Sequence, residues 1–328
     1  MAKQRGQGEL TQIGGMPIFT KLTKKYVTPT PIQQRLIDTA AAKIEQPEAS
    51  LSALYQHSAL CQTFLPYRDP GDDARTWERL NGAVHLKVLA GEAMHPVEKR
   101  LTPVGLPFGP KARVVLMHIN QHALIVKSPE IAVEATLTKF VSRTLKLDTD
   151  GRTIRTVKDQ LSRLSAASIR LGIIKDGHAL TVNSQIITAF DIWFKKDDRQ
   201  RILWPSTILL SLDYWESLKA HAVPLNESAV AALSHSALAL DIYAWLTQRL
   251  HRVPITKPAF IVWPLLQAQF GANYDRLRSF RTAFKVALKQ VATVYPEARI
   301  DLNQRGMTLR NSAPPVPPRL FFASAKAC

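Results

Sequence analysis

The feature that most constrains this 328-residue chain is an order of local sequence patterns that occurs twice. Over residues 110–187 the patterns predict a helix, a short strand, a helix, a turn, a longer helix and a β-hairpin. Residues 237–310 predict the same order again, although the sequence itself does not repeat. Three helices followed by a hairpin are the elements of a winged helix. The chain is therefore expected to have an α+β, mostly helical fold with two winged-helix (helix-turn-helix plus β-hairpin) domains in tandem.

The first copy starts at Pro110, because proline is favoured in the first turn of a helix. A hairpin is expected at its end, where Asp176-Gly177 separates two runs rich in β-branched residues. The predicted elements are helices at 110–127, 137–147 and 152–168 and strands at 130–133, 169–174 and 179–187.

The second copy follows Asn226, which can cap a short helix. Pro264 begins one helix, Gly271 ends it, and Pro296 stops the long helix that Asp275 opens. The predicted elements are helices at 229–233, 237–250, 265–270 and 275–295, a strand at 259–262, and a hairpin of strands 299–302 and 307–310 around residues 303–306.

These patterns divide the chain into four parts. Residues 1–104 are expected to form a basic arm and a small accessory region, with a helix at 31–45 and a strand at 85–89. Residues 102–110 contain three prolines and two glycines and are interpreted as a linker. The first winged-helix domain is expected over 105–222 and the second over 223–313, followed by a Pro-rich tail at 314–328.

The charge of the chain indicates a polyanionic partner. It has 43 Lys and Arg against 26 Asp and Glu, a net charge of +17, and residues 221–328 have 13 against 5. Such an excess favours nucleic acid or an anionic membrane surface. Because no apolar run approaches the roughly 20 residues that span a bilayer, nucleic acid is the expected partner. With only two cysteines and no apolar signal segment at the N-terminus, a cytoplasmic protein is expected.

The strongest functional pattern lies in the helix at 275–294. At 100° per residue its apolar side chains gather on one face and its basic side chains on the opposite face, with Asp275 as the only acid. In a helix-turn-helix the second helix enters the major groove, where arginine can bind guanine. The candidate DNA-binding residues are Arg276, Arg278 and Arg281 for bases, Lys285 and Lys289 for phosphates, and Arg305 at the hairpin tip. The alternative is a solvated helix face; Arg305 and the charge of this third of the chain favour DNA.

A weaker version of this pattern is found at 152–168. The candidate DNA-binding residues there are Arg152, Arg155, Lys158 and Arg163, with Lys139 and Arg143 from the preceding helix. The helix N-terminus at Gly151 could hold a phosphate. Because Asp159 lies within the basic face, DNA contact and a dimer interface both remain open.

Patterns typical of catalysis are missing from the sequence. There is no phosphate-binding loop of the G-x-x-x-x-G-K-[ST] type. His118 and His122 are spaced like zinc ligands but lack the glutamate of H-E-x-x-H. The carboxylates near residues 69–78 lie in a Pro/Gly loop, where a solvated acidic turn is favoured over a Mg²⁺ site. We therefore expect no catalytic residue, no metal and no cofactor.

Several segments resemble the plasmid-encoded RepA family of replication initiators. They are Leu-Pro-Phe-Gly-Pro-Lys-Ala-Arg at 106–113, Lys-Ser-Pro-Glu-Ile at 127–131, Lys-Asp-Gln-Leu-Ser-Arg-Leu-Ser-Ala-Ala-Ser at 158–168, and shorter stretches at 61–66, 77–82 and 280–291. The resemblance implies binding to repeated origin sequences (iterons), melting of adjacent AT-rich DNA, and recruitment of the host initiator DnaA and the replicative helicase. Relatives with tandem winged helices also repress their own promoter as homodimers.

Four functions remain to be separated. A plasmid replication initiator is expected first, and a winged-helix transcriptional repressor or autorepressor without initiator activity second. A nicking enzyme would cleave supercoiled DNA with Mg²⁺. A partition-type protein would coat DNA without preference for repeats.

Overall fold

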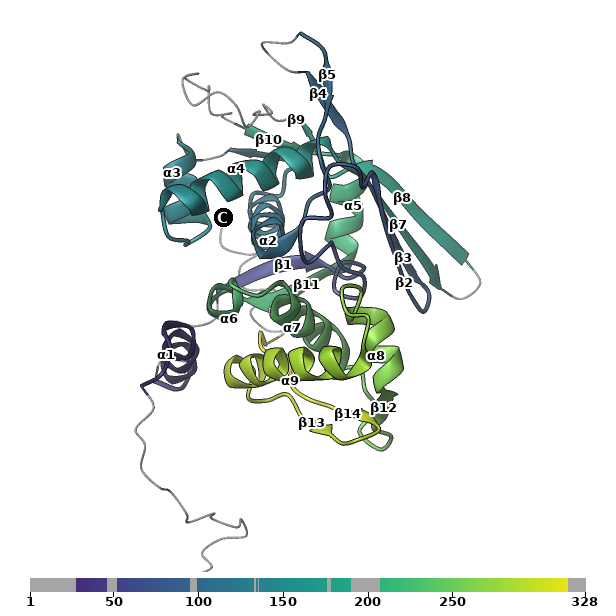
Figure 1. Cartoon of the computed structure of the whole chain (residues 1–328). Helices are drawn as coiled ribbons and strands as arrows, with labels where there is room; N and C mark the ends of the chain where they lie inside the picture. Colours follow the sequence, from purple (N-terminus) through teal and green to yellow (C-terminus); the bar gives the residue numbers. More distant parts are fainter. Residues whose placement is uncertain are drawn as a thin grey trace, which may run out of the picture.

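A computed structural model describes residues 28–45, 52–94, 99–132, 134, 136–175, 178–189 and 207–317. The architecture is mixed, with helices and several small sheets (Figure 1). The expected basic arm, the Asp176-Gly177 turn and the end of the tail lie outside the described residues. No helix within the described ranges is long and apolar enough to cross a membrane.

The first unit is formed around one long helix and a four-stranded sheet. In it, helix α2 (Gly109–Val126) packs against α4 (Gly151–Ala166), and the sheet has the order β2-β3-β7-β8. The strands of this sheet are β2 (Thr76–Asn81), β3 (Val84–Leu89), β7 (Ser168–Lys175) and β8 (His178–Gln185). Its other elements are β4 (Glu92–Met94), β5 (Leu101–Pro103), β6 (Glu130–Ala132), α3 (Leu137–Lys139), the π-helical turn η1 (Phe140–Thr144), β9 (Ile187–Ala189), β10 (Thr207–Leu210) and α5 (Leu212–His221).

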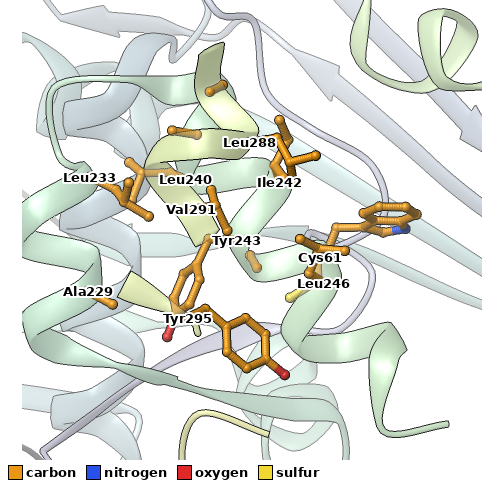
Figure 2. Close-up of a cluster of buried hydrophobic side chains, with 14 of the residues drawn as sticks. Cys61, Ala229, Leu233, Leu240, Ile242, Tyr243, Leu246, Leu288, Val291 and Tyr295 are labelled. Atoms are coloured by element: carbon orange, nitrogen blue, oxygen red, sulfur yellow. The ribbon is translucent and has the colours of Figure 1, made fainter. Parts of the chain in front are cut away.

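The second unit is smaller, and its three-stranded sheet has the order β12-β14-β13. Figure 2 shows part of its core, where Leu240 and Tyr243 of α7 meet Leu288 and Val291 of α9. Its elements are α6 (Glu227–Leu233), α7 (Ala237–Leu250), β12 (Ala259–Val262), α8 (Trp263–Phe270), α9 (Leu277–Val294), β13 (Ile300–Leu302) and β14 (Gly306–Leu309). Helix α1 (Pro31–Glu45) packs on α6 and α9 of this unit.

Helix α2 belongs to the cores of both units. Val114 and Met117 are buried with the side chains of α7 and α9, whereas Val115 and Ile119 are buried with those of α4 and the four-stranded sheet. A two-stranded sheet adds a second connection, because β1 (Ala53–His57) pairs with β11 (Ala222–Asn226), which directly precedes α6. In Figure 1, α2 and this sheet lie between α4 and α9.

Most of the predicted helices and strands are confirmed. The side chain of Asn226 accepts a hydrogen bond from the Ala229 amide and so caps α6 as expected. The long basic helix forms as α9, although Asp275 does not cap it, because the N-cap position is Arg276. Both expected hairpins also form, as β7–β8 and β13–β14.

The single helix predicted at 137–147 is wrong. One turn of α-helix, α3, passes into the π-helical turn η1, in which the Leu145 amide donates to the Phe140 carbonyl at 3.0 Å. A wider turn shifts the side-chain positions relative to α-helical periodicity. As a result Phe140, Val141 and Leu145 are all buried.

The segment at 102–110 is packed and is not a free linker. Leu106 is buried, and the Phe108 amide donates to the Gln160 side chain of α4 at 2.8 Å. Its first residues form β5, which pairs with β4. Strand β3, which precedes this segment, pairs with β7, so the four-stranded sheet joins residues from both sides of position 104.

The Pro-rich tail, expected to follow the second domain from residue 314, still packs on that domain over its first residues. Val316 is buried, and the Tyr295 hydroxyl donates to the Ala313 carbonyl at 2.7 Å. The chain therefore stays against the second unit to at least this point.

Candidate nucleic-acid interface

Helix α9 has an apolar face and a basic face, as the sequence predicts. Phe280, Phe284 and Val291 are fully buried against the rest of the second unit. Burial of each such side chain contributes roughly 1.5–3 kcal/mol, so the apolar face fixes how the helix is rotated. The opposite face then has to point outward. Its basic side chains are exposed at Arg278, Lys285 and Lys289, and partly exposed at Arg281.

Trp263, the first residue of α8, connects this basic face to the β13–β14 hairpin. The Arg281 guanidinium lies 5.0 Å and the Lys285 ammonium 5.9 Å from the centre of a Trp263 ring. The indole Nε1–H donates to the Asn303 carbonyl at 3.1 Å, and the Trp263 amide donates to the Arg305 carbonyl at 3.2 Å. One buried side chain therefore holds two cations of α9 and the hairpin turn. These contacts could not be found from the sequence, because Trp263 lies 40 residues before Asn303.

The hairpin turn displays Arg305. The Asn303 side-chain oxygen accepts hydrogen bonds from the amides of Arg305 and Gly306 at 2.8 and 2.9 Å. Gly306 is required because a Cβ there would come within 2.1 Å of the Ile261 carbonyl oxygen on β12. Such an Asx turn fixes the backbone by local bonds. Arg305 is exposed at its tip.

The charge of this surface is not neutralised within the described part of the chain. None of the ion pairs there involves the expected residues of the second unit, which are Arg276, Arg278, Arg281, Lys285, Lys289 and Arg305. Arg310, on the same unit, differs because it pairs with Asp301 at 3.0 Å. A group of cations without acidic partners is typical of a surface that binds a polyanion. We call these six residues the α9 surface.

The first unit displays a smaller group of basic side chains. Lys139, Arg143, Arg152 and Arg155 are exposed and Lys158 is half-buried. The expected phosphate site at the N-terminus of α4 is wrong, because Asp150 already occupies it. The Asp150 carboxylate accepts from the Arg152 and Thr153 amides at 2.9 and 3.0 Å and from the Thr153 hydroxyl. These bonds, chiefly those with Thr153, lower the pKa of Asp150.

Arg163 was expected on the exposed face of the same helix, and this is wrong. Its side chain is 3% exposed, and its guanidinium pairs with Asp159 at 3.0 Å and donates to the Leu106 carbonyl at 3.1 Å. The guanidinium also lies 4.9 Å from the centre of the Phe108 ring. Arg163 therefore holds the 105–108 segment against α4. Asp159, expected to share its face between DNA and a partner chain, forms part of this internal contact.

The two basic groups do not come together. In Figure 1, α4 lies at the top of the molecule and α9 at the bottom, with α2, the β1–β11 sheet and α7 between them. The two basic groups therefore lie on helices of different units.

Within the described residues, the candidate metal ligands do not gather at one site. No group of three or more His, Cys, Asp or Glu side chains within the described residues is arranged to hold a metal ion. Burial lowers the pKa of His118 to about 4 and also lowers that of His122. Both histidines line a cavity of about 290 Å³. In the acidic segment, Glu78 pairs with His85 at 2.6 Å, and Asp69 lies 3.5 Å from Arg163.

Comparison with known proteins gives a matching family and similar solved structures. The family described as plasmid-encoded RepA protein matches residues 106–263. Two crystal structures of domains 2 and 3 of RctB are similar to the chain at 8% identity. One covers 77% of this chain and 96% of that chain with a TM-score of 0.49, and the other covers 76% and 94% with a TM-score of 0.44. No curated protein matches the chain.

The matched residues begin at the buried Leu106 and include α3, η1 and α4, which carry the basic side chains of the first unit. They end at Trp263, which lies under the α9 surface. The segment 106–263 of this chain belongs to the family of plasmid-encoded RepA proteins.

Proposed function

We propose that this protein is a plasmid replication initiator that binds double-stranded DNA in a sequence-specific manner. The observation that carries the proposal is the α9 surface, a group of cations without acidic partners in the described part of the chain, two of which lie against a buried tryptophan beside a hairpin. Membership of residues 106–263 in the RepA family supports the same function.

The second unit is proposed to act as a winged helix. Helices α7, α8 and α9 precede β13 and β14, and β12 pairs with β14. In this arrangement α9 enters the major groove, with Arg276, Arg278 and Arg281 near its N-terminal end directed to bases. Lys285, Lys289 and Arg305 bind phosphates on either side. Arg281 loses little side-chain freedom on binding because Trp263 already holds it.

The first unit is proposed to act as the second winged helix of the tandem. Lys139, Arg143, Arg152, Arg155 and Lys158 supply a weaker, mainly phosphate-directed contact with the same duplex or with a second repeat. Surface not used in this way is available for a second copy of the chain, as in relatives that form homodimers.

Initiation needs no covalent chemistry from this protein. Binding to origin repeats strains the neighbouring AT-rich duplex, and the free energy of the added contacts offsets the cost of deformation. The host initiator DnaA and the replicative helicase are proposed to load on the opened DNA. The protein is accordingly proposed to be a cytoplasmic, non-enzymatic, metal-free DNA-binding protein.

The test is a footprint on supercoiled DNA that carries the region around this gene. The expected result is protection of direct repeats together with permanganate-reactive thymines in an adjacent AT-rich segment. Protection without reactive thymines would instead identify a transcriptional repressor. Uniform coating without preference for repeats would identify a partition-type protein.

The same preparation tests the enzymatic alternative. Supercoiled plasmid is incubated with Mg²⁺ and analysed for nicked circles. Nicking by the wild type that is lost in Asp72→Ala/Asp73→Ala would overturn the non-enzymatic proposal. The Arg278→Ala/Arg281→Ala variant is the binding control, because it should lose protection of repeats while remaining folded.

A further inference from the structure

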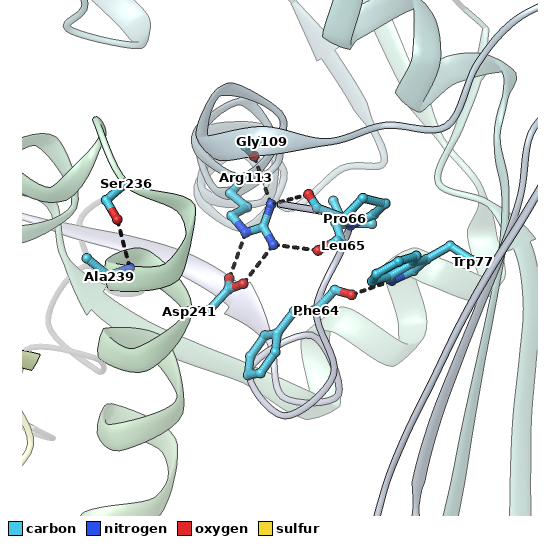
Figure 3. Close-up of polar contacts among 9 residues, drawn as sticks. All are labelled: Phe64, Leu65, Pro66, Trp77, Gly109, Arg113, Ser236, Ala239 and Asp241. Atoms are coloured by element: carbon cyan, nitrogen blue, oxygen red, sulfur yellow. Dashed lines mark hydrogen bonds and ion pairs between the residues drawn. The ribbon is translucent and has the colours of Figure 1, made fainter. Parts of the chain in front are cut away.

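Arg113 of α2 is completely surrounded by hydrogen-bond acceptors. Its Nε and Nη2 donate to the two carboxylate oxygens of Asp241, each at 2.7 Å. Nη2 also donates to the Leu65 carbonyl at 2.7 Å, and Nη1 donates to the carbonyls of Gly109 and Pro66 at 2.8 and 3.2 Å. All five guanidinium N–H groups are therefore used (Figure 3).

These contacts join the two units. Arg113 lies on α2, between side chains that belong to the two different cores, and Asp241 lies on α7 of the second unit. The side chains of Arg113 and Asp241 are 2% and 6% exposed. The pair thus lies inside the contact between the units, where a planar fork facing a planar carboxylate permits one relative orientation.

An ion pair at this depth is a poor way to gain stability. Removing two charges from water costs several kcal/mol each, and buried pairs replaced by apolar residues of similar volume are often neutral or more stable. Burial raises the pKa of Asp241 even though Arg113 opposes the shift. The adjacent apolar contacts of Val114 and Met117 already hold the units together. The attraction between apolar side chains is itself non-directional, so the geometry of the polar pair adds to the orientation that their packing and the β1–β11 sheet already favour.

We propose that the Arg113–Asp241 pair is a positioning element that fixes the angle between α2 and α7. It would thereby set the distance and rotational phase between the α9 surface and the basic group of the first unit. This role rests on the proposed function, because the two surfaces need a fixed phase only if both contact DNA. An apolar replacement should preserve the fold and lose the fixed orientation.

The direct test is a distance distribution between spin labels, measured without DNA. Labels are placed at Ala220→Cys on α5 and Ala292→Cys on α9, both exposed, in a Cys328→Ser background. Cys61 is fully buried, so it should not react. The wild type should give one narrow distribution, and Arg113→Met/Asp241→Leu a broader or displaced one with an unchanged circular dichroism spectrum. Identical distributions would overturn the proposal.

Two further variants keep the test decisive. Lys43→Met/Glu297→Leu removes an ion pair of the same length, 2.7 Å, from the surface of the second unit, and should leave the distribution narrow. If the double apolar variant does not fold, Asp241→Asn keeps the volume and the carbonyl contacts of Arg113 but removes the charge. A narrow, unshifted distribution for folded Asp241→Asn would then count against the proposal.

A binding experiment with DNA distinguishes failure of this inference from failure of the proposed function. Spacing between the two contact regions is changed by about half a helical turn, or roughly 5 bp. Wild type should lose about tenfold in affinity, equivalent to 1.4 kcal/mol, and the apolar variant clearly less. If wild type shows no preference for repeats, the proposed function fails, whereas the positioning role is still decided by the label distances.

Discussion

Arg281 differs from Arg278 because a neighbouring side chain holds it. Its guanidinium lies over Trp263 and is partly exposed, whereas Arg278 is exposed and has no such contact. A cation–π contact of this kind is worth about 0.5–1 kcal/mol at exposed sites. Arg281 therefore has a structural contact in addition to its proposed binding role, and Arg278 is the cleaner position at which to test base contact.

Arg278→Ala should weaken binding to the preferred repeat by about 1–3 kcal/mol and relax the preference at one base pair. The reason is loss of a bidentate contact without loss of packing, since the side chain is exposed. Binding is measured by titration against a set of single-base variants of the repeat.

Lys257→Ala is the matched control for this experiment. It removes the same charge from the same unit, at the end of the sheet away from the Asn303–Gly306 turn. Equal losses in Arg278→Ala and Lys257→Ala would mean that α9 contributes charge and does not read bases.

Lys289→Ala should reduce affinity for all DNA sequences alike and lower the slope of log affinity against log salt concentration by about one.

Gly306→Ala should destabilise the second unit by about 1–3 kcal/mol, because the added Cβ meets the Ile261 carbonyl and β12 has to move. Urea unfolding measures the loss. Gly151→Ala is the control, since nothing lies within 4 Å of its Cβ and alanine favours helix. If the urea midpoint of Gly306→Ala equals that of wild type, the hairpin tolerates displacement, and the packing of Trp263 does not depend on the position of the hairpin.

At the scale of elements, helical periodicity predicted the apolar face of α9 and α4 correctly. It could not predict what covers the other face. Arg163 falls opposite the apolar stripe, but the 105–108 segment returns over α4 and buries it. The π-helical turn η1 was also missed, because its extra residue breaks the period on which the prediction depends.

The cap of α4 makes its stability depend on pH. Hydrogen bonds from Thr153 and Arg152 stabilise the ionised Asp150, so its folded pKa lies below the ordinary value of 3.8. The stabilisation is present above that value and is lost as pH falls through the folded pKa. The protection of the first-turn amides of α4 against hydrogen exchange, relative to the intrinsic rate at each pH, should therefore decrease below about pH 4.

Asp150→Asn tests this origin. Asparagine is an equally favoured N-cap but does not titrate, so the protection of the α4 amides relative to the intrinsic rate should not decrease in this pH range. Parallel acid dependence in wild type and Asp150→Asn would assign the effect to groups elsewhere in the chain.

At the scale of the whole molecule, the sequence predicted two successive units but not how they are joined. Pairing of β1 with β11 and of β3 with β7 connects residues separated by at least 79 positions, and no local pattern encodes it. Helix α2 was predicted correctly as a helix, yet its role in two cores depends on burial of both faces. The same limit applies to the α9 surface: the sequence indicates its basic residues, but not the tryptophan that holds two of them.

The junction of the units should make the whole fold sensitive to acid. His57 of β1 is fully buried; its Nδ1 accepts from the Ala59 amide at 3.1 Å, and its Nε2 lies 2.9 Å from the Ser217 hydroxyl of α5. Burial, with a smaller contribution from His221, lowers the pKa of His57 to about 3 from 6.5. The folded state therefore excludes a proton that the unfolded chain binds below pH 6.5.

Stability conferred by neutral His57 is fully present above pH 6.5 and declines as pH falls toward about 3. The expected slope is up to about 1.4 kcal/mol per pH unit, and buried His118 adds to it. Urea unfolding at pH 7, 6 and 5 measures the slope.

The variant His57→Asn should be less stable than wild type at pH 7, but its stability should decline less steeply as the pH falls. His251→Asn, which changes an exposed histidine of the second unit, should retain the wild-type slope. If the two variants decline in parallel, the acid sensitivity does not arise at the β1–β11 junction, and protonation of His57 would have to be accommodated without opening it.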